Sequence, residues 1–118
     1  MKILRFHTLI PIALIAGITT VVASPTPAAT KPTRIAITVK QGRPVGGIRR
    51  PVIKKGTLVR IVVTTDAGKE VHLHGYNIEK PVVHGRPVVM RFTAKLAGRF
   101  ELEMHDPDVL LAQLTVKP

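Results

Sequence analysis

Apolar and polar residues alternate along this chain with a period of two from Thr33 to the C-terminus, and turn residues interrupt the pattern about every 8–12 positions. No segment shows the longer period of an amphipathic helix. Successive side chains of a strand point to opposite faces of its sheet, so each alternating segment can bury one face and expose the other. The pattern predicts an all-β Greek-key β-sandwich of about six or seven short antiparallel strands.

The strongest predicted strand spans residues 57–65, in which Val59, Ile61 and Val63 are expected to face the core. A segment rich in Gly, Pro and Arg, residues 41–51, precedes it. The same alternation predicts further strands at residues 34–39, 70–76, 87–94, 98–105 and 112–116.

The first 23 residues have the pattern of a secretory signal peptide. Lys2 and Arg5 precede an apolar stretch, and Val21 and Ala23 occupy the −3 and −1 positions before Ser24. We expect cleavage near Ala23–Ser24 and a mature protein in the periplasm or outside the cell. The alternative is an uncleaved membrane anchor, although the uncharged run is about 16 residues long and a membrane span needs about 20.

Residues 24–32 form a short Pro-rich lead-in, with three prolines and no large apolar side chain. The remaining residues, 33–118, are expected to form one domain, because a chain of 118 residues is too short for two independent cores. No internal repeat is visible in this part of the sequence.

The chain contains no cysteine, which excludes disulfides, iron–sulfur clusters, thiol nucleophiles and thiolate-ligated blue copper. Any metal ion must therefore be bound by His, Met or carboxylate side chains. The sequence also lacks a Ser-His-Asp order, a paired-carboxylate pattern and a Gly-rich phosphate loop. We therefore expect a binding protein rather than an enzyme.

His72 and His74 are the candidate metal ligands that the strand pattern itself indicates. Two residues apart on a strand, they share one face and lie about 6.5–7 Å apart, which lets them converge on one metal ion. Imidazole suits Cu(II), Zn(II) and Ni(II). The alternative interpretation is that both residues belong to a solvated sheet face; His84 is expected to be a turn residue.

Several segments resemble the cupredoxin superfamily, and the resemblance covers residues 33–116. Residues 53–64 are similar to its x-x-G-x-x-V-x-I-x-V strand, and residues 71–76 to the strand that carries its first His ligand. Residues 97–104 and 114–116 are similar to the hairpin that carries its remaining ligands. The resemblance implies a cupredoxin-like sandwich.

The sequence departs from the family where the family has its copper-binding Cys, because Met104 occupies that position and residues 106–110 hold neither His nor Met. The run from His72 to Gly75 also resembles the His-x-His-Gly strands of multicopper oxidases, but the further His-x-His pairs of those enzymes are missing. We therefore expect no type 1 blue-copper centre. The chain is similar to the cysteine-free cupredoxin-like domains of secreted bacterial proteins.

The resemblance also implies a third ligand, since in cupredoxins the hairpin strand lies next to the strand with the first His. This adjacency would place His105 beside His72 and His74. Met104 and Glu103 are secondary candidates, because a thioether favours Cu(I) and a carboxylate can bind a metal or orient an imidazole. The expected cofactor is copper, with zinc or another divalent ion as the alternative.

Eighteen Lys and Arg residues against seven Asp and Glu residues give a net charge of +11, which favours anionic partners. Arg49, Arg50, Lys54 and Lys55 are candidate contacts with an anionic membrane or envelope surface, or else form a solvated face. Three Phe, one Tyr and no Trp offer no stacking platform, so we expect no nucleic-acid partner. The sequence thus predicts a secreted metal-binding module or, alternatively, a metal-free interaction domain with a basic surface.

Overall fold

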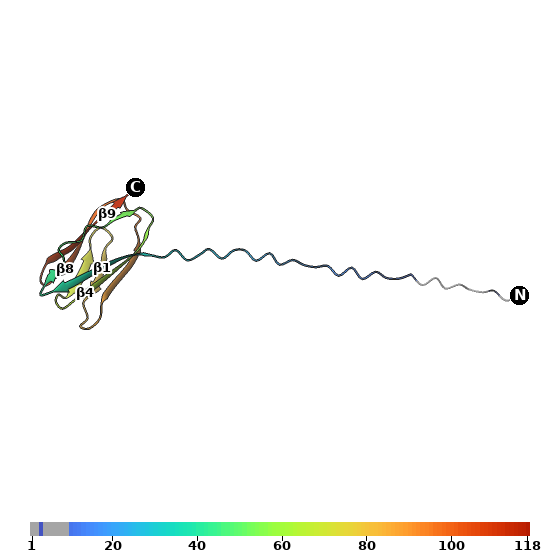
Figure 1. Ribbon diagram of the computed structural model, residues 1–118, viewed down its shortest axis with the longest axis horizontal. Coiled ribbons are helices and arrows are strands. Elements are labelled where there is room, and N and C mark those ends of the chain that lie inside the picture. Colours follow the sequence, from blue (N-terminus) through green and yellow to red (C-terminus); the bar gives the residue numbers. More distant parts are fainter. Residues whose placement is uncertain (1–2, 4–9) are drawn as a thin grey trace.

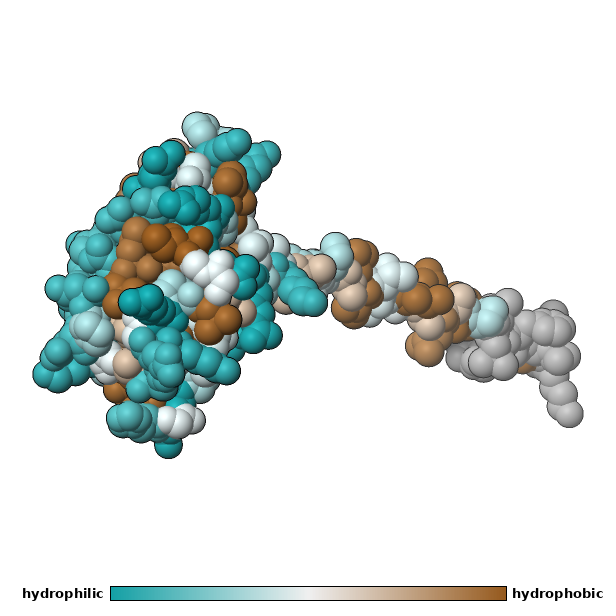
Figure 2. Space-filling view, turned by 60° about the vertical axis from the view of Figure 1, so that its left-hand side comes forward, coloured by the Kyte–Doolittle hydropathy of each residue, from teal (hydrophilic) through white to brown (hydrophobic). Residues whose placement is uncertain are grey.

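The computed structural model describes residue 3 and residues 10–118. Residues 10–32 form neither helix nor strand and extend away from a domain built of strands (Figure 1). Their large apolar side chains are at least 83% exposed, and Figure 2 shows hydrophobic residues along this segment. Part of the expected signal peptide, residues 1–2 and 4–9, lies outside the described residues. Within the described ranges, no helix has the length and apolar character needed to cross a membrane.

One layer of the domain is a sheet of four strands in the order β2-β1-β4-β7. These strands are β1 (Thr33–Lys40), β2 (Arg43–Pro44), β4 (Leu58–Thr65) and β7 (Val88–Thr93). Ile, Val and Thr fill most of β1 and β4, and such β-branched residues favour extended backbone. β1 and β4 run parallel, whereas β7 pairs with β4 in the antiparallel direction.

The second layer is a sheet of five strands in the order β3-β9-β8-β5-β6. They are β3 (Val52–Lys54), β5 (Glu70–Leu73), β6 (Ile78–Pro81), β8 (Gly98–His105) and β9 (Val109–Lys117). β3 and β9 are parallel, and the other neighbours are antiparallel. Together the two sheets make an all-β sandwich, as the alternation predicts.

Two details of the predicted sandwich are wrong: the described residues contain nine strands rather than six or seven, and two of the strand pairs are parallel. Strands joined by a hairpin run antiparallel, but β1 reaches β4 only through residues 41–57, which pass along the other sheet as β3. The strand predicted over residues 70–76 ends at Leu73, and residues 74–77 form a turn into β6.

The core lies between the sheets and draws on both of them. Val59, Ile61 and Val63 are at most 2% exposed, as predicted. Phe92 and Phe100 are only partly buried and pack against the cluster. The buried members of the cluster are Ile35, Ile37, Val39, Ile53, Val59, Ile61, Val63, Val71, Leu73, Val88, Met90, Ala94, Leu102, Met104, Leu111, Ala112, Leu114 and Val116.

Gly68, in the turn before β5, lies so close to the buried side chain of Met104 that a side chain at position 68 would not fit. Its φ is +86°, and an added Cβ would lie 2.5 Å from Cγ and 2.6 Å from Sδ of Met104. Gly85 has a similar φ of +76°, but nothing lies within 4 Å of its Cβ position. Gly68 therefore combines a left-handed backbone with a steric limit, whereas Gly85 has the left-handed backbone alone.

We expect Gly68→Ala to lower the free energy of unfolding by about 1–3 kcal/mol more than Gly85→Ala does, because overpacking against Met104 adds to the backbone strain that both variants share. Urea unfolding of the two variants measures the difference. Equal losses would contradict the close packing of Gly68.

Candidate metal centre

The pairing of β5 with β8 brings the candidate ligands together. In its antiparallel register His72 lies opposite Glu103, and Glu70 lies opposite His105. Val71 and Leu73 are fully buried, so the intervening His72 points away from the core. His105 likewise follows the fully buried Met104 and points to the same outer face of the five-stranded sheet.

His74 lies one residue beyond the end of β5, yet it stays on the same side as His72. Its backbone N–H donates to the carbonyl of Glu101 at 2.9 Å, which holds the chain against β8. The chain then turns at Gly75, where φ is +80° and an added Cβ would lie 2.5 Å from Cδ1 of Phe100. A close approach that only glycine permits therefore fixes the position of the second histidine.

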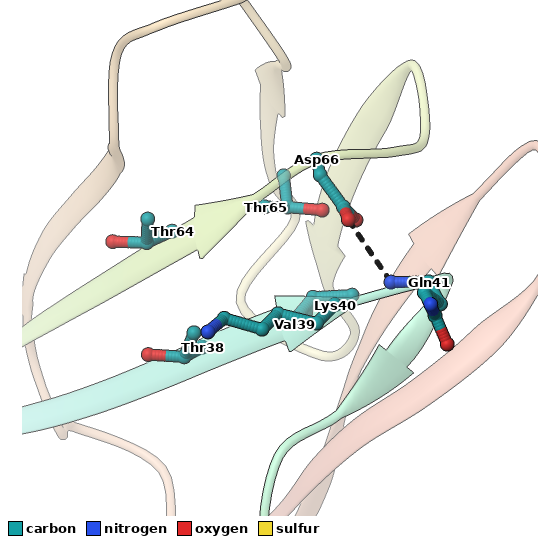
Figure 3. Close-up of a pocket in the computed structure, with 7 residues that line it drawn as sticks. All are labelled: Thr38, Val39, Lys40, Gln41, Thr64, Thr65 and Asp66. Carbon is teal, nitrogen blue, oxygen red and sulfur yellow. Dashed lines mark hydrogen bonds between the residues drawn. The ribbon is translucent and has the colours of Figure 1, made fainter.

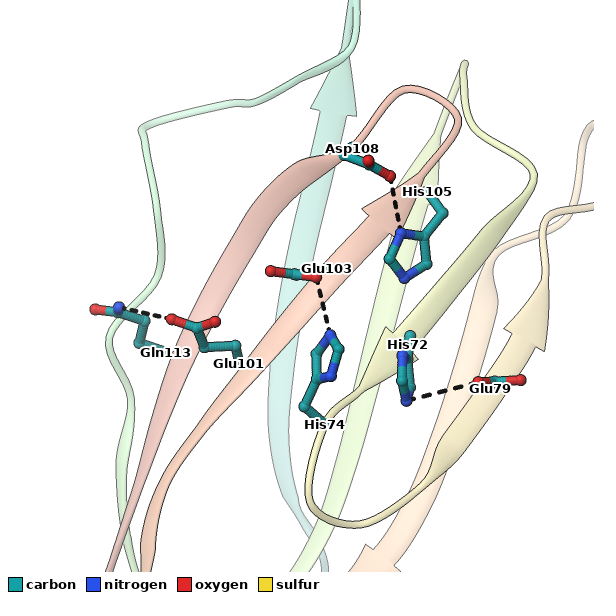
Figure 4. Close-up of polar contacts among 8 residues, drawn as sticks. All are labelled: His72, His74, Glu79, Glu101, Glu103, His105, Asp108 and Gln113. Carbon is teal, nitrogen blue, oxygen red and sulfur yellow. Dashed lines mark hydrogen bonds and ion pairs between the residues drawn. The ribbon is translucent and has the colours of Figure 1, made fainter.

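The three imidazoles surround a common space (Figure 4). Ring centroids are 4.0 Å apart for His72 and His74, 5.9 Å for His72 and His105, and 6.4 Å for His74 and His105. One ring nitrogen from each residue lies within 4.8 Å of the other two. All three residues are half-buried, so solvent and small ions can reach the rings.

Each imidazole also has a carboxylate on its outer side (Figure 4). Glu103 Oε2 lies 2.9 Å from His74 Nε2, and Asp108 Oδ1 lies 2.9 Å from His105 Nδ1. Glu79 Oε1 is more distant, at 3.7 Å from His72 Nε2.

These contacts leave Nδ1 of His74 and Nε2 of His105 available to a metal ion. A carboxylate that accepts from the second ring nitrogen orients the imidazole and makes it a better ligand. The arrangement therefore supplies both the ligands and the groups that orient them.

The contact between His105 and Asp108 changes the pKa of both groups. The hydrogen bond to Asp108 raises the pKa of His105 above its ordinary 6.5, and the same bond lowers the pKa of Asp108 below its ordinary 3.8. The charged pair thus stabilises the fold between these two pKa values. Its contribution is lost as the pH rises through the pKa of His105 or falls through that of Asp108.

The two secondary candidates, Glu103 and Met104, lie on opposite sides of the five-stranded sheet. Glu103 lies at the centre, where it contacts His74 rather than its neighbour His105. Met104 points into the core instead, fully buried, with its Sδ accepting from Thr65 Oγ1 at 3.5 Å. Met104 therefore lies on the opposite side of the sheet from the three imidazoles.

Sequence reasoning missed Glu79 and Asp108. Asp108 lies three residues after His105 in the turn before β9, a spacing that could have suggested a local contact. Glu79 lies on β6, a strand that the alternation does not predict. It comes close to the imidazole of His72 because β5 and β6 pair with these two residues opposite each other. His84 is exposed in a turn, as expected.

The basic candidates lie on other elements, and all four are exposed. Arg49 and Arg50 line a cleft of about 480 Å³ with Arg34, Lys54 ends β3, and Lys55 begins the following turn. Neither His72 nor His74 lines this cleft.

A larger hollow, of about 580 Å³, lies between the ends of β1 and β4 (Figure 3). Residues 38–41 and 64–66 line it, and the backbone N–H of Gln41 donates to Asp66 Oδ2 at 3.0 Å across it. None of the described histidines lines this hollow, so it is separate from the candidate metal centre.

No protein-family model and no curated protein matches the sequence. Solved structures do match the fold. A copper-binding protein solved by NMR in its apo form has a TM-score of 0.57 and 17% identity, over 71% of this chain and 86% of that chain. The metal-binding domain of the Streptococcus pneumoniae D39 Cu(I)-exporting P-type ATPase CopA, solved with Cu(I), has a TM-score of 0.56 and 21% identity, over 72% and 85%.

A multicopper oxidase also matches, with a TM-score of 0.54 and 17% identity over 72% of this chain. The match covers only 42% of that chain. At these identities the likenesses concern the fold alone. They show that residues of this domain form a cupredoxin-like sandwich, which confirms the fold that the resemblance implies.

In an NMR titration of the metal-free protein, we expect His105 to titrate with a pKa above 6.5, because the carboxylate of Asp108 stabilises the imidazolium. Asp108→Asn removes that charge and should lower the pKa of His105. An unchanged titration of His105 in Asp108→Asn would contradict the contact.

Proposed function

We propose that this domain is a metal-binding module that binds one copper ion through His72, His74 and His105. The observation that carries the proposal is the convergence of one ring nitrogen from each of the three residues within 4.8 Å. Neutral imidazole is a common metal ligand, and three imidazoles are a donor set of metal sites that keep one coordination position open.

The residues present fit such an ion. Metal–nitrogen bonds of about 2.0–2.1 Å place tetrahedral nitrogens about 3.3 Å apart, so the rings must draw inward from their present spacing. Half-buried rings at the end of a strand and at a turn can make this adjustment by side-chain rotation. Glu103 and Asp108 would hold His74 and His105 in the orientation that binding needs.

Copper is the ion that we propose, since imidazole sites favour Cu(II) among the divalent first-row metals. Support also comes from two solved structures of the same fold that are described as copper-binding or hold Cu(I). The sequence has no cysteine, so the proposed centre has no thiolate and is not a type 1 site. Zinc is the alternative ion for the same three ligands.

We also propose that the domain binds or carries the ion rather than catalyses a reaction, and that it does so after export. The proposal of export rests on the signal-like pattern of residues 1–23, and the core begins only at Ile35. The proposed location is the periplasm or the outside of the cell. A single mononuclear centre of three histidines is sufficient for binding and transfer of an ion.

Calorimetric titration with Cu(II) and with Zn(II), at a pH above the pKa of His105, tests the proposed function. We expect one ion per chain in the wild type and in the control His84→Ala, whose side chain is exposed in a turn. Affinity should fall at least tenfold in His72→Ala, in His74→Ala and in His105→Ala, because each removes one of three ligands.

Equal, weak binding in the wild type and in all four variants would contradict the proposal. That result would favour the alternative function, a metal-free interaction domain with a basic surface. Circular dichroism of each variant shows whether a loss of binding comes from the ligand or from unfolding.

A further inference from the structure

Three arginines stand side by side across the four-stranded sheet. In the strand register Arg34 of β1 is the partner of Arg60 in β4, and Arg60 is the partner of Arg91 in β7. The residues that flank them, such as Ile35 and Ile61, belong to the core, so the arginines point to the outer face. This face is on the opposite side of the sandwich from the three histidines.

No acidic residue among the described residues forms an ion pair with the row. Neither β1, β2, β4 nor β7 contains an acidic residue, and all seven carboxylates of the chain lie between Asp66 and Asp108. Among the described residues, no ion pair involves an arginine. Like charges directly opposite each other on neighbouring strands are destabilising, so an anionic ligand would relieve the repulsion.

Arg60 gives a second, independent indication. Its Nε is buried and has no hydrogen-bond partner within the described part of the chain. A buried donor without an acceptor costs free energy, and such groups in native proteins often mark a ligand or ion site. An anion bound between Arg34 and Arg91 would lie close to this central guanidinium.

The row continues around the edge of the sheet. Arg34 also lines the cleft of about 480 Å³ that contains Arg49 and Arg50. The segment holding these two residues is fixed to β9, since Gln113 N–H donates to the carbonyl of Arg49 at 2.8 Å. We call the whole set the arginine band, and its members are Arg34, Arg49, Arg50, Arg60 and Arg91.

The chemistry of the arginine band favours phosphate, which guanidinium groups bind in a bidentate geometry. The row crosses three strands and is therefore about 10 Å wide, more than one phosphate can span. The ligand must therefore present several phosphates over a surface.

The remaining outward positions identify the kind of surface. On β1, β4 and β7 they hold aliphatic, hydroxyl or basic side chains and no aromatic ring on which a base could stack. Ala36, Val62 and Val89 form the next row beside the arginines, and Leu58 is 37% exposed. Basic groups among aliphatic ones suit the boundary between lipid headgroups and acyl chains.

We propose that this outer face of the four-stranded sheet docks on a membrane surface of anionic phospholipids, with the arginine band binding several headgroup phosphates. Docking in this orientation leaves the three histidines on the side that faces solvent. The proposal does not depend on metal binding, because the two faces share no residue.

Co-sedimentation of the full chain with vesicles tests the proposal. The vesicles contain either an equimolar mixture of phosphatidylglycerol and phosphatidylcholine or phosphatidylcholine alone. The variant Arg34→Gln/Arg60→Gln/Arg91→Gln removes the row. The control Lys80→Gln/Lys95→Gln/Lys117→Gln removes the same charge from exposed positions outside the arginine band. All proteins keep residues 1–32, so any contribution of that segment is common to them.

We expect the arginine variant to bind phosphatidylglycerol vesicles about 100-fold more weakly than the wild type, and the control to lose less than about fivefold. Because Arg60 is partly buried, Arg34→Gln/Arg91→Gln provides a second variant at exposed positions, and circular dichroism checks that each protein is folded. Binding should also weaken with added NaCl.

Three results would overturn the proposal. Equal losses in the arginine variants and in the lysine control would mean that net charge alone causes binding. Equal binding to vesicles of phosphatidylcholine alone would mean that phosphatidylglycerol is not recognised. Displacement by millimolar inorganic phosphate at constant ionic strength would mean that the arginines bind a compact anion rather than a lipid surface.

Discussion

The antiparallel register of β5 and β8 is the constraint on which the candidate metal centre depends. Val71, Leu73, Leu102 and Met104 are fully buried, and they keep the two strands in register because a slip of one residue would expose them. The same register turns the alternate residues outward and sets His72 opposite Glu103. The burial of apolar side chains on the inner face of these strands therefore determines which polar side chains lie together on the outer face.

The sandwich separates its charges between its two outer faces. All carboxylates borne by strands lie on the five-stranded sheet. Two of them, Glu79 and Glu103, contact imidazoles, as does Asp108 in the turn between β8 and β9. The charged residues of the four-stranded sheet are all basic. One face therefore provides groups suited to a cation, and the other provides groups suited to anions.

Alternation of apolar and polar residues predicts the long strands and the shared face of His72 and His74, because both follow from the period of a strand. The short strands β2, β3 and β6 have two to four residues each and form only by pairing with a longer strand. Their own sequences therefore do not predict them. Glu79 was missed for this reason. The position of His105 came from a family resemblance, and the arginine row depends on pairing between strands that are distant in sequence.

The assignment of ring nitrogens is the most direct test of the candidate centre. Long-range proton–nitrogen NMR spectra of the protein with one equivalent of Zn(II) distinguish a metal-bound ring nitrogen from a protonated one. The contacts with Glu103 and Asp108 predict that the metal binds Nδ1 of His74 and Nε2 of His105, while the opposite nitrogens stay protonated. Binding through the opposite nitrogens, or no change at these two residues, would contradict the account.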